Sequence, residues 1–377
     1  MIDLVYAEHD WILYLAAFAC AFGIALVATP YAKKLAYKFN AVKHPRARDM
    51  HSKPMPQMGG VAIVLGFIIT VAIMAIFMPY FRDIEFLGLA IGGIIIAGLG
   101  IADDILELRS ITKLIVQIIV AVIVVASGIR MEIVVWPITA YLQPFSIPIT
   151  ILWIVGMTNA VNFIDGLDGL AAGVSAIGAI CLMVLCILSG SPLAVVLSAI
   201  LAGSILGFLP RNFNPAEIFM GDTGALFIGY VLAVSSILGV FKGYTLLAIL
   251  IIFFALSLPI FDTLFAFCRR LYKSRKLSST MVADKGHIHH RLIDAGFSTK
   301  QSVFIMYAVS AVTAVIAVVI AMQDFHVIII TAISLAAMVI ALRVYSKRTS
   351  KANEEQKNQP EQIDQADEIE QVSSEEI

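Results

Sequence analysis

The chain has 377 residues, of which 60% are hydrophobic and 14% are charged, with a mean hydropathy of +0.91 and a formal net charge of −1. This composition excludes an ordinary soluble globular protein and indicates a polytopic membrane protein. No excess of basic residues points to a nucleic-acid partner. The four cysteines fall in or beside apolar runs and suggest neither a disulfide nor a metal framework.

Apolar runs of about 20 residues, each long enough to cross a hydrocarbon core of roughly 30 Å, recur along most of the chain. We therefore expect an all-α integral membrane protein with about eleven transmembrane helices. The first run follows acidic residues and lacks a small-residue cleavage site, so we expect it to be retained rather than removed as a signal peptide. The expected spans are residues 11–29, 60–79, 86–102, 111–128, 146–163, 169–189, 192–209, 221–240, 244–268, 303–322 and 325–343.

The distribution of basic residues predicts the orientation of these helices. With eleven spans, all of the 26 lysines and arginines except Arg82, Arg130 and Lys242 fall in loops on one side. Because basic loops stay in the cytoplasm, we expect the N-terminus outside and the C-terminus inside. Residues 349–377 are rich in Glu, Gln, Asp and Ser without aromatics, so we expect a disordered cytoplasmic tail after a membrane domain of residues 1–348.

The stretch NAVNFIDGLDG, residues 159–169, joins two of these runs. It places Asn159, Asn162, Asp165 and Asp168 at successive three-residue steps, which predicts four polar groups on one helical face. Ionisable residues at the edge of a membrane span are costly, so they indicate a binding or reaction site. The alternative is a hydrated loop that is polar by chance.

Other polar motifs fall on the same expected side of the membrane. Asp103 and Asp104 follow the third run, Asp222 opens the eighth, and the HIHH segment from His287 lies in the long loop after the ninth. Clustered carboxylates beside basic residues suit Mg²⁺ bridged to phosphate oxygens, and no cysteine lies among these motifs to favour zinc. Taken singly, the aspartates could be helix caps or turn residues, and the histidines a chance surface cluster.

The chemistry of these loops indicates that one substrate is a water-soluble phosphorylated compound and the other lies in the bilayer. The glycine pair Gly59 and Gly60 opens the second run, and its backbone N–H groups could meet a phosphate. A transporter or channel for an anionic solute is the alternative. Transport sites, however, lie near the bilayer midplane and usually between inverted repeats, whereas these groups lie at the ends of spans and no internal repeat is visible.

Four motifs carry a resemblance to a known family. In order they are DD at Asp103, NAVNFIDGLDGL from Asn159, FNPAEIFMGDTG from Phe213 and HIHHRL from His287, and together they resemble the polyprenyl-phosphate N-acetylhexosamine-1-phosphate transferases over about residues 10–345. The chain is most similar to the WecA/TagO branch, which has an HxHxRL motif. The phospho-N-acetylmuramoyl-pentapeptide transferase branch has an acidic residue where this chain has Arg291.

This resemblance implies a reaction and its partners. GlcNAc-1-phosphate would pass from UDP-GlcNAc to undecaprenyl phosphate, releasing UMP, as the first membrane step of a cell-surface polymer such as wall teichoic acid. The family relationship implies a multi-pass location in a bacterial cytoplasmic membrane, Mg²⁺ as cofactor with Mn²⁺ as a substitute, and an ability of two copies to form a homodimer. The alternative within the family is transfer of phospho-MurNAc-pentapeptide for peptidoglycan.

The resemblance also implies roles for individual residues. The second aspartate pair would bind uridine and orient the donor, and the first pair would hold the acceptor phosphate. The histidines and the arginine of HIHHRL would contact the donor's phosphates and sugar. The implied catalytic residues are Asp103, Asp104, Asp165, Asp168, His287, His289 and His290; the implied substrate-binding residues are Asn159, Asn162, Lys53, Arg48 and Arg291; the implied metal ligands are Asp222 and Asn162.

The first cytoplasmic loop departs from the family pattern at one informative position. Asp49 stands where relatives carry a lysine, while Arg48 and the glycine pair of the pattern remain. Any contact of that lysine with the donor phosphate would therefore fall to Lys53 or Arg48.

Overall fold

The structure is a computed structural model of the chain, and it describes residues 10–43, 54–132, 143–240, 260, 292 and 296–322. All of these belong to one unit, Met1–Met322, and the second unit, Gln323–Ile377, lies outside the described residues. Two expected spans, 244–268 apart from Ile260 and 325–343, and the expected tail also lie outside them.

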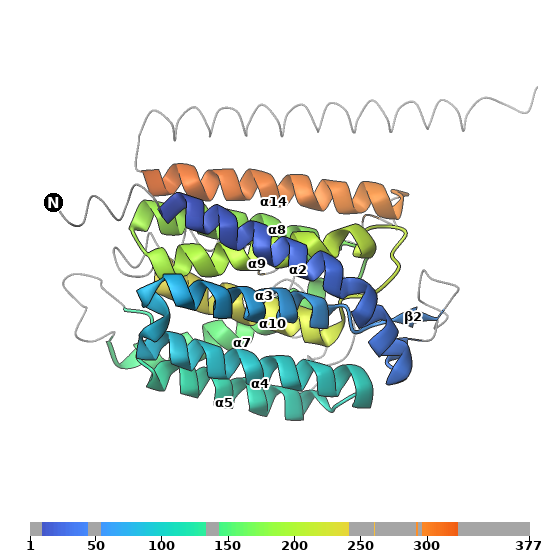
Figure 1. Ribbon diagram of the computed structural model, residues 1–377, viewed down its shortest axis with the longest axis horizontal. Coiled ribbons are helices and arrows are strands. Elements are labelled where there is room, and N and C mark those ends of the chain that lie inside the picture. The colour runs from blue at the N-terminus through green and yellow to red at the C-terminus, as the bar shows by residue number, and fades with distance from the viewer. Residues whose placement is uncertain are drawn as a thin grey trace, which may run out of the picture. The chain divides into compact units, whose positions relative to one another are not determined.

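The other nine expected spans are helices in the described part of the chain (Figure 1). Eight are long and apolar enough to cross a membrane, and Ser110–Ala126 is shorter, which confirms an all-α polytopic membrane protein. The first helix continues to Lys38, past its expected end, because it accommodates Pro30 internally. The elements are α2 (Asp10–Lys38), β1 (Val42–Lys43), β2 (Met55–Pro56), α3 (Gly60–Phe77), η1 (Pro79–Arg82), α4 (Ile84–Leu106), α5 (Ser110–Ala126), η2 (Gln143–Phe145), α7 (Ser146–Ile164), α8 (Leu170–Ser189), α9 (Pro192–Asn212), α10 (Gly221–Val240) and α14 (Thr299–Met322).

Helix α10 is the most deeply buried of the spans, and it packs against α3, α4, α7, α8 and α9 (Figure 1). Its polar side chains bond to neighbouring helices. The hydroxyl of Tyr230 donates to the carbonyl oxygen of Leu89 in α4 (2.8 Å), and Nε1 of Trp153 in α7 donates to Oγ of Ser236 (3.1 Å). Since no water is present in a hydrocarbon core to satisfy such groups, these bonds fix α10, and its N-terminal turn with it.

Helices α2 and α9 approach each other closely through small residues. A Cβ at Gly203 or Gly207 would lie 2.3 Å from the carbonyl oxygen of Phe18 or Phe22 in α2, respectively. The facing surface of α2 is also small, with Ala21 fully buried there. Close backbone approach at small residues is a common way for helices to associate in a membrane, where lipid is as apolar as leucine.

A short antiparallel ribbon lies beside the start of α10. Strand β1 pairs with β2 in the register Val42↔Pro56, and the N–H of Phe219 then donates to the carbonyl oxygen of Pro56 (2.8 Å). This ribbon ties the segment that precedes α3 to the segment that precedes α10. The N-termini of the two helices are therefore held together.

The glycine pair at the start of α3 is used within the fold. The N–H groups of Gly59 and Gly60 donate to the carbonyl oxygens of Phe219 (2.9 Å) and Met220 (2.7 Å), so they are already satisfied by protein rather than directed to a phosphate. A Cβ on Gly60 would lie 2.0 Å from the backbone nitrogen of Gly224. Glycine is required here because the backbones of α3 and α10 meet.

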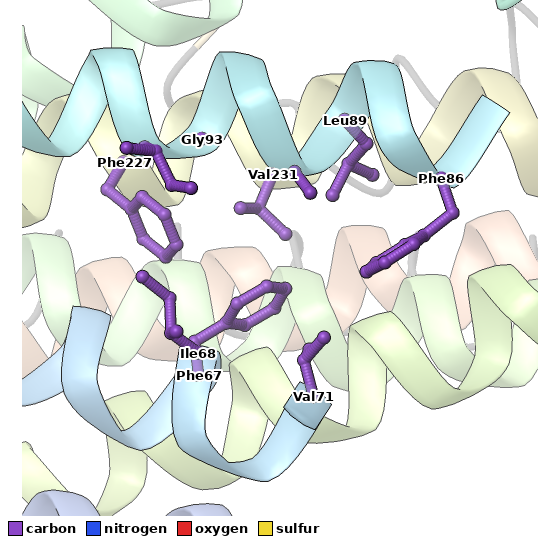
Figure 2. A pocket seen from close by; sticks show the side chains of 10 residues that line it. Phe67, Ile68, Val71, Phe86, Leu89, Gly93, Phe227 and Val231 are labelled. Carbon is purple, nitrogen blue, oxygen red and sulfur yellow. The ribbon is translucent and has the colours of Figure 1, made fainter. Parts of the chain in front are cut away.

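An apolar cavity of about 80 Å³ lies between α3, α4 and α10 (Figure 2). Phe67 of α3, Phe86 and Leu89 of α4 and Phe227 of α10 face one another across it. Its lining contains no titratable side chain. The cavity is therefore part of the apolar body of the protein, and the charged chemistry lies elsewhere.

Candidate active site

The first turn of α10 carries Asp222 in a fixed position. Gly221, just before it, has a φ of +72°, in the left-handed region that favours glycine. A Cβ there would lie 2.1 Å from the carbonyl oxygen of Gln57 and 2.6 Å from the carboxylate oxygens of Asp104. Both the conformation and the available space therefore require the glycine of the GDTG motif.

Lys113 in α5 joins Asp222 to Asp103. Its Nζ lies 2.7 Å from Oδ2 of Asp222 and 2.8 Å from Oδ2 of Asp103. The other carboxylate oxygen of Asp103 accepts the N–H of Leu108 (2.8 Å), which fixes its orientation. All three charged side chains are only partly exposed, so solvent and salt screen them less than they would a surface pair.

Lys113 was not among the predicted site residues, although its position in the sequence carries a signal. Lys113 and Gln117 lie one turn apart on α5, and the rest of this helix from Leu114 onward is apolar. Polar residues one turn apart on an apolar helix share a face and indicate a polar neighbour. That signal shows that α5 faces something polar, but not that the partners are Asp103 and Asp222.

Asn162 in α7 also reaches Asp222. Its Nδ2 donates to Oδ2 of Asp222 at 3.3 Å, so the same carboxylate oxygen receives Lys113 and Asn162. The structure thus brings together Asp103, Asp222 and Asn162, which come from α4, α10 and α7. The roles implied for them by family resemblance remain predictions.

The expectation that four polar residues of residues 159–168 share one helical face is wrong. Helix α7 ends at Ile164, and Asp165 is its C-cap with φ −75° and ψ 62°. Asp168 then lies in the turn before α8, where Gly169 has a φ of +76°. Helix α7 has ended before the glycines of the GLDG sequence, and the left-handed conformation at Gly169, the N-cap of α8, redirects the chain into α8.

Asp165, at the end of α7, is half-buried. Burial, together with the negative charge of Asp222, raises the pKa of the Asp165 carboxyl to about 7, and Lys43 opposes this effect. A raised pKa means that a second negative charge is costly at this place.

Asp104 is buried and contacts the backbone at the start of α10. Its Oδ1 accepts the N–H of Asp222 (2.8 Å), and its Oδ2 accepts the N–H (3.2 Å) and the hydroxyl (2.5 Å) of Thr223. Although Asp103 and Asp104 are adjacent, they face different neighbours, because successive residues of a helix are separated by about 100°.

Asp168 is likewise buried, against the segment between α9 and α10. Its Oδ2 accepts Nδ2 of Asn214 (3.0 Å) and the N–H of Ala216 (3.1 Å). The Gly169 carbonyl beside it accepts the hydroxyl of Tyr307 in α14 (2.6 Å). The turn that carries Asp168 is therefore tied to two other parts of the fold.

Asn159 is engaged with α5. Its Nδ2 donates to Oε1 of Gln117 (2.6 Å) and to the carbonyl oxygen of Val155 (2.8 Å), and Gln117 is 1% exposed. The implied contact of Asn159 with substrate stays a prediction. The geometry favours a structural role in which Asn159 and Gln117 connect α7 to α5. Asn159 lies one helical turn from Asn162, and Gln117 lies one turn from Lys113.

The residues around Asp222 fit a magnesium ion that takes part of its coordination from substrate. Among the residues that the structure describes, no three His, Cys, Asp or Glu side chains form a complete metal site. Asp222 and Asn162 supply one carboxylate and one amide oxygen, and Mg²⁺ is usually held by one or two protein ligands with phosphates and water completing the shell. This donor set suits a hard cation and not zinc.

Several predicted site residues lie outside the described residues, in the first cytoplasmic loop and in the segment after the ninth expected span. They remain predictions from the sequence. They are Arg48, Lys53, His287, His289, His290 and Arg291.

Comparison with known proteins identifies a family whose profile covers these residues. The profile described as "Glycosyl transferase family 4" matches residues 86–240, which include Asp103, Lys113, Asn162 and Asp222. A "Probable undecaprenyl-phosphate N-acetylglucosaminyl 1-phosphate transferase" from Bacillus subtilis is 38% identical over 83% of this chain and 86% of its own length. A "Decaprenyl-phosphate N-acetylglucosaminephosphotransferase" from Mycobacterium leprae is 33% identical over 75% of this chain and 78% of its own length.

A third relative represents the other branch of the same group. A "Phospho-N-acetylmuramoyl-pentapeptide-transferase" from Caldanaerobacter subterraneus is 30% identical over 78% of this chain and 93% of its own length. The fold, the site and these relatives together define a multi-pass membrane glycosyl-1-phosphate transferase. The chain belongs to glycosyl transferase family 4, the family of the polyprenyl-phosphate N-acetylhexosamine-1-phosphate transferases.

Proposed function

We propose that this protein transfers GlcNAc-1-phosphate from UDP-GlcNAc to undecaprenyl phosphate, giving undecaprenyl-pyrophosphoryl-GlcNAc and UMP. The observation that carries this proposal is the bridge from Lys113 to Asp103 and Asp222, beside Asn162, in a chain whose B. subtilis relative is named for this reaction. An oxygen of the acceptor phosphate bonds to the β-phosphorus of the donor. The bond from that phosphorus to UMP breaks, and UMP leaves with the electron pair.

The reaction must bring two anions together. At roughly 4 Å and an effective dielectric constant near 20, two unit negative charges repel by about 4 kcal/mol. Lys113 places a positive charge between two carboxylates at this point, and its ammonium can turn toward a phosphate that enters beside Asp222. Asp103 holds the ammonium in place when no substrate is present.

We infer that Mg²⁺, with Mn²⁺ as a substitute, is the cofactor. Asp222 and Asn162 would hold it, because they are adjacent oxygen donors of the kind that Mg²⁺ prefers. When bound, the ion would neutralise the donor pyrophosphate and stabilise the departing UMP.

We propose that the membrane arrangement follows the distribution of basic residues. Eleven spans with the N-terminus outside would place the ends of α4, α7 and α10 that carry Asp103, Asn162 and Asp222 on the cytoplasmic face, where UDP-GlcNAc is available. The C-terminus would also lie in the cytoplasm. A homodimer is proposed on family resemblance alone.

The donor sugar is assigned from Arg291, whose position in HIHHRL matches the GlcNAc branch. We propose that UDP-GlcNAc supports turnover more than tenfold better than UDP-MurNAc-pentapeptide. The similarity to the C. subterraneus relative makes the latter donor the second candidate. Equal rates with the two donors would leave the reaction class standing and remove the sugar assignment.

The direct test uses purified protein, UDP-GlcNAc, undecaprenyl phosphate and Mg²⁺, with release of UMP as the readout. Activity should require both substrates and should be lost with EDTA and restored by added Mg²⁺. The matched control is Lys34→Met, because Lys34 lies over the ring of Tyr31 at 5.9 Å on the exposed surface of α2 and should not affect turnover. Absence of UMP release under these conditions would refute the proposed reaction.

A further inference from the structure

The segment that connects α9 to the first turn of α10, residues 213–223, is held near both of its ends by aspartates from other elements. Near its start, the carboxylate of Asp168 accepts bonds from Asn214 and Ala216. At its end, the carboxylate of Asp104 accepts bonds from Asp222 and Thr223. The segment therefore runs between two carboxylates that belong to the turn before α8 and to the end of α4.

The surroundings of Asp104 leave little capacity for a substrate. Three hydrogen bonds already use most of the roughly four acceptor sites of a carboxylate. The residue is 5% exposed, and a Cβ on Gly221 would collide with its oxygens. A phosphate anion brought against this carboxylate would meet a like charge without a bridging cation, since Lys113 contacts Asp103 and Asp222.

Asp168 is enclosed in a similar way. It is 3% exposed and accepts one bond from a side-chain amide and one from a backbone N–H on the same oxygen. Asp165, in the same motif, is more exposed. One member of each aspartate pair, Asp104 or Asp168, thus binds segment 213–223.

We propose that Asp104 and Asp168 are positioning residues that contact no substrate and that hold segment 213–223 so that Asp222 meets Lys113 and Asn162. The expected loss of turnover rests on the proposed function, whereas the role of the two aspartates in holding segment 213–223 does not. Asp104 acts on the α10 turn itself, through the residue that carries the Asp222 side chain. Asp168 acts further away, at the start of the segment.

This proposal differs from the role that family resemblance implies for both residues. If Asp104 held the acceptor phosphate, its loss would raise the KM for undecaprenyl phosphate. If Asp104 only orients the α10 turn, its loss lowers kcat and leaves that KM nearly unchanged, because a misplaced Asp222 affects the chemical step. For Asp168, the varied substrate is UDP-GlcNAc. A role in donor binding predicts a higher KM for UDP-GlcNAc, and a positioning role predicts a lower kcat with a nearly unchanged KM.

The decisive experiment is a double-mutant cycle between Asp104 and Thr223. The variants are Asp104→Asn, Thr223→Val and the double variant, measured for thermal stability in detergent and for kcat and KM in the UMP-release assay. Thr223→Ser keeps the hydroxyl and is the conservative rescue. Thr70→Val is the matched control, since Thr70 is fully buried in α3 as Thr223 is in α10, and its Oγ1 has no hydrogen-bond partner.

Residues that act through one shared contact show non-additive effects. We expect Asp104→Asn to lower kcat by about 30-fold and Thr223→Val by about fivefold, with the double variant close to Asp104→Asn alone. The KM for undecaprenyl phosphate should stay within about twofold in all of them, and Thr223→Ser and Thr70→Val should behave like wild type. Asp168→Asn and Asn214→Leu form the second cycle, with the same expected pattern.

The outcomes separate the proposal from its alternatives. A rise of tenfold or more in the acceptor KM for Asp104→Asn, or multiplicative effects of Asp104→Asn and Thr223→Val, would overturn it. If Asp104→Asn does not fold, Thr223→Val decides, because it removes one bond and no charge. Wild-type protein that releases no UMP would refute the proposed function, while coupling of Asp104 and Thr223 in thermal stability would still support the bracing.

Discussion

The two ends of α10 are satisfied in chemically different ways. At its C-terminal end, the hydroxyls of Ser189 and Ser191 donate to the carbonyl oxygens of Gly239 and Leu238. At its N-terminal end, the carboxylate of Asp104 accepts the backbone N–H groups. Both arrangements satisfy groups that a helix leaves unpaired at its ends. One uses neutral groups and the other uses a charge.

This difference indicates which end of a buried helix can carry charged groups. A carboxylate at a helix N-terminus is favoured by the partial positive charge of the unpaired N–H groups. The same end carries Asp222, Lys113 and Asn162 in contact with one another. The C-terminal end has no ionisable contact among the described residues, and its bonds only close the fold. Substitutions at the two ends should therefore have different consequences for turnover.

Asp222→Asn is expected to have the largest effect. It removes the negative charge that Lys113 and the proposed Mg²⁺ share, and we expect kcat to fall by about a thousandfold in protein that still folds. The measurement is UMP release by purified protein, with size-exclusion behaviour and thermal stability as controls for folding. Activity close to wild type would show that Asp222 is only a residue of the α10 turn.

Lys113→Met should come next, with kcat lower by about a hundredfold. Without the ammonium, the carboxylates of Asp103 and Asp222 face each other and repel an incoming phosphate. Lys113→Arg is the matched variant, because it keeps the charge but changes its geometry, and it should recover part of the activity. An inactive arginine variant together with an active methionine variant would contradict the electrostatic role.

Gln117→Leu tests the link between α5 and α7. Loss of its bond to Asn159 should loosen the register that brings Lys113 and Asn162 to the same oxygen, and we expect kcat to fall by about tenfold. The KM for UDP-GlcNAc should change little if Asn159 acts through Gln117. A large rise in that KM for Asn159→Leu but not for Gln117→Leu would instead support direct contact of Asn159 with the donor.

Ser191→Ala addresses the opposite end of α10. It removes one hydrogen bond to the carbonyl oxygen of Leu238 (3.0 Å), so we expect a loss of about 1 kcal/mol of stability and unchanged kcat. Thermal unfolding in detergent and the UMP-release assay measure the two quantities on the same sample. A fall in kcat comparable with that of the lysine variant would remove the contrast between the two ends.

Glu217→Gln should have the smallest effect. Glu217 contacts Lys33 (3.1 Å) and Arg211 (3.2 Å) at the surface, and its hydrogen bond to Lys33 is the main reason that the pKa of this carboxyl lies below its usual value. A lowered acid pKa contributes stability above the ordinary value of 4.5, and this contribution is lost as the pH falls through the lowered value. We expect less than about 1 kcal/mol, decreasing with added salt. A larger or salt-independent loss would show that the contact is not a surface pair.

Much of the fold could be predicted from the sequence, because hydropathy is a local property. Nine expected spans correspond to helices, with ends within a few residues except where α2 runs past Pro30. The three-residue step from Asn159 was misleading, because its polar spacing fits a helix, whereas α7 ends at Ile164 and Gly169 is the N-cap of α8. Backbone conformation at Gly169 prevailed over side-chain periodicity.

The site could be predicted only in part. Motifs identified Asp103, Asn162 and Asp222, whose proximity the structure shows. They could not identify Lys113, because its partner Asp222 lies 109 residues away and the contact depends on how α5 packs. Nor could they separate Asp103 from Asp104, because two adjacent aspartates look equivalent until the neighbours on each side of α4 are known.

Tyr307 has a consequence for how much of this chain can be removed. Its ring occupies the space above Gly173, where a Cβ would lie 2.0 Å from a ring carbon, and its hydroxyl satisfies the carbonyl oxygen of Gly169. A truncated chain that stops before α14 would leave a hollow on α8 and would remove one of the two hydrogen bonds that the carbonyl oxygen of Gly169 accepts. The family profile ends at residue 240, but the smallest unit that keeps this turn intact must extend at least to Tyr307.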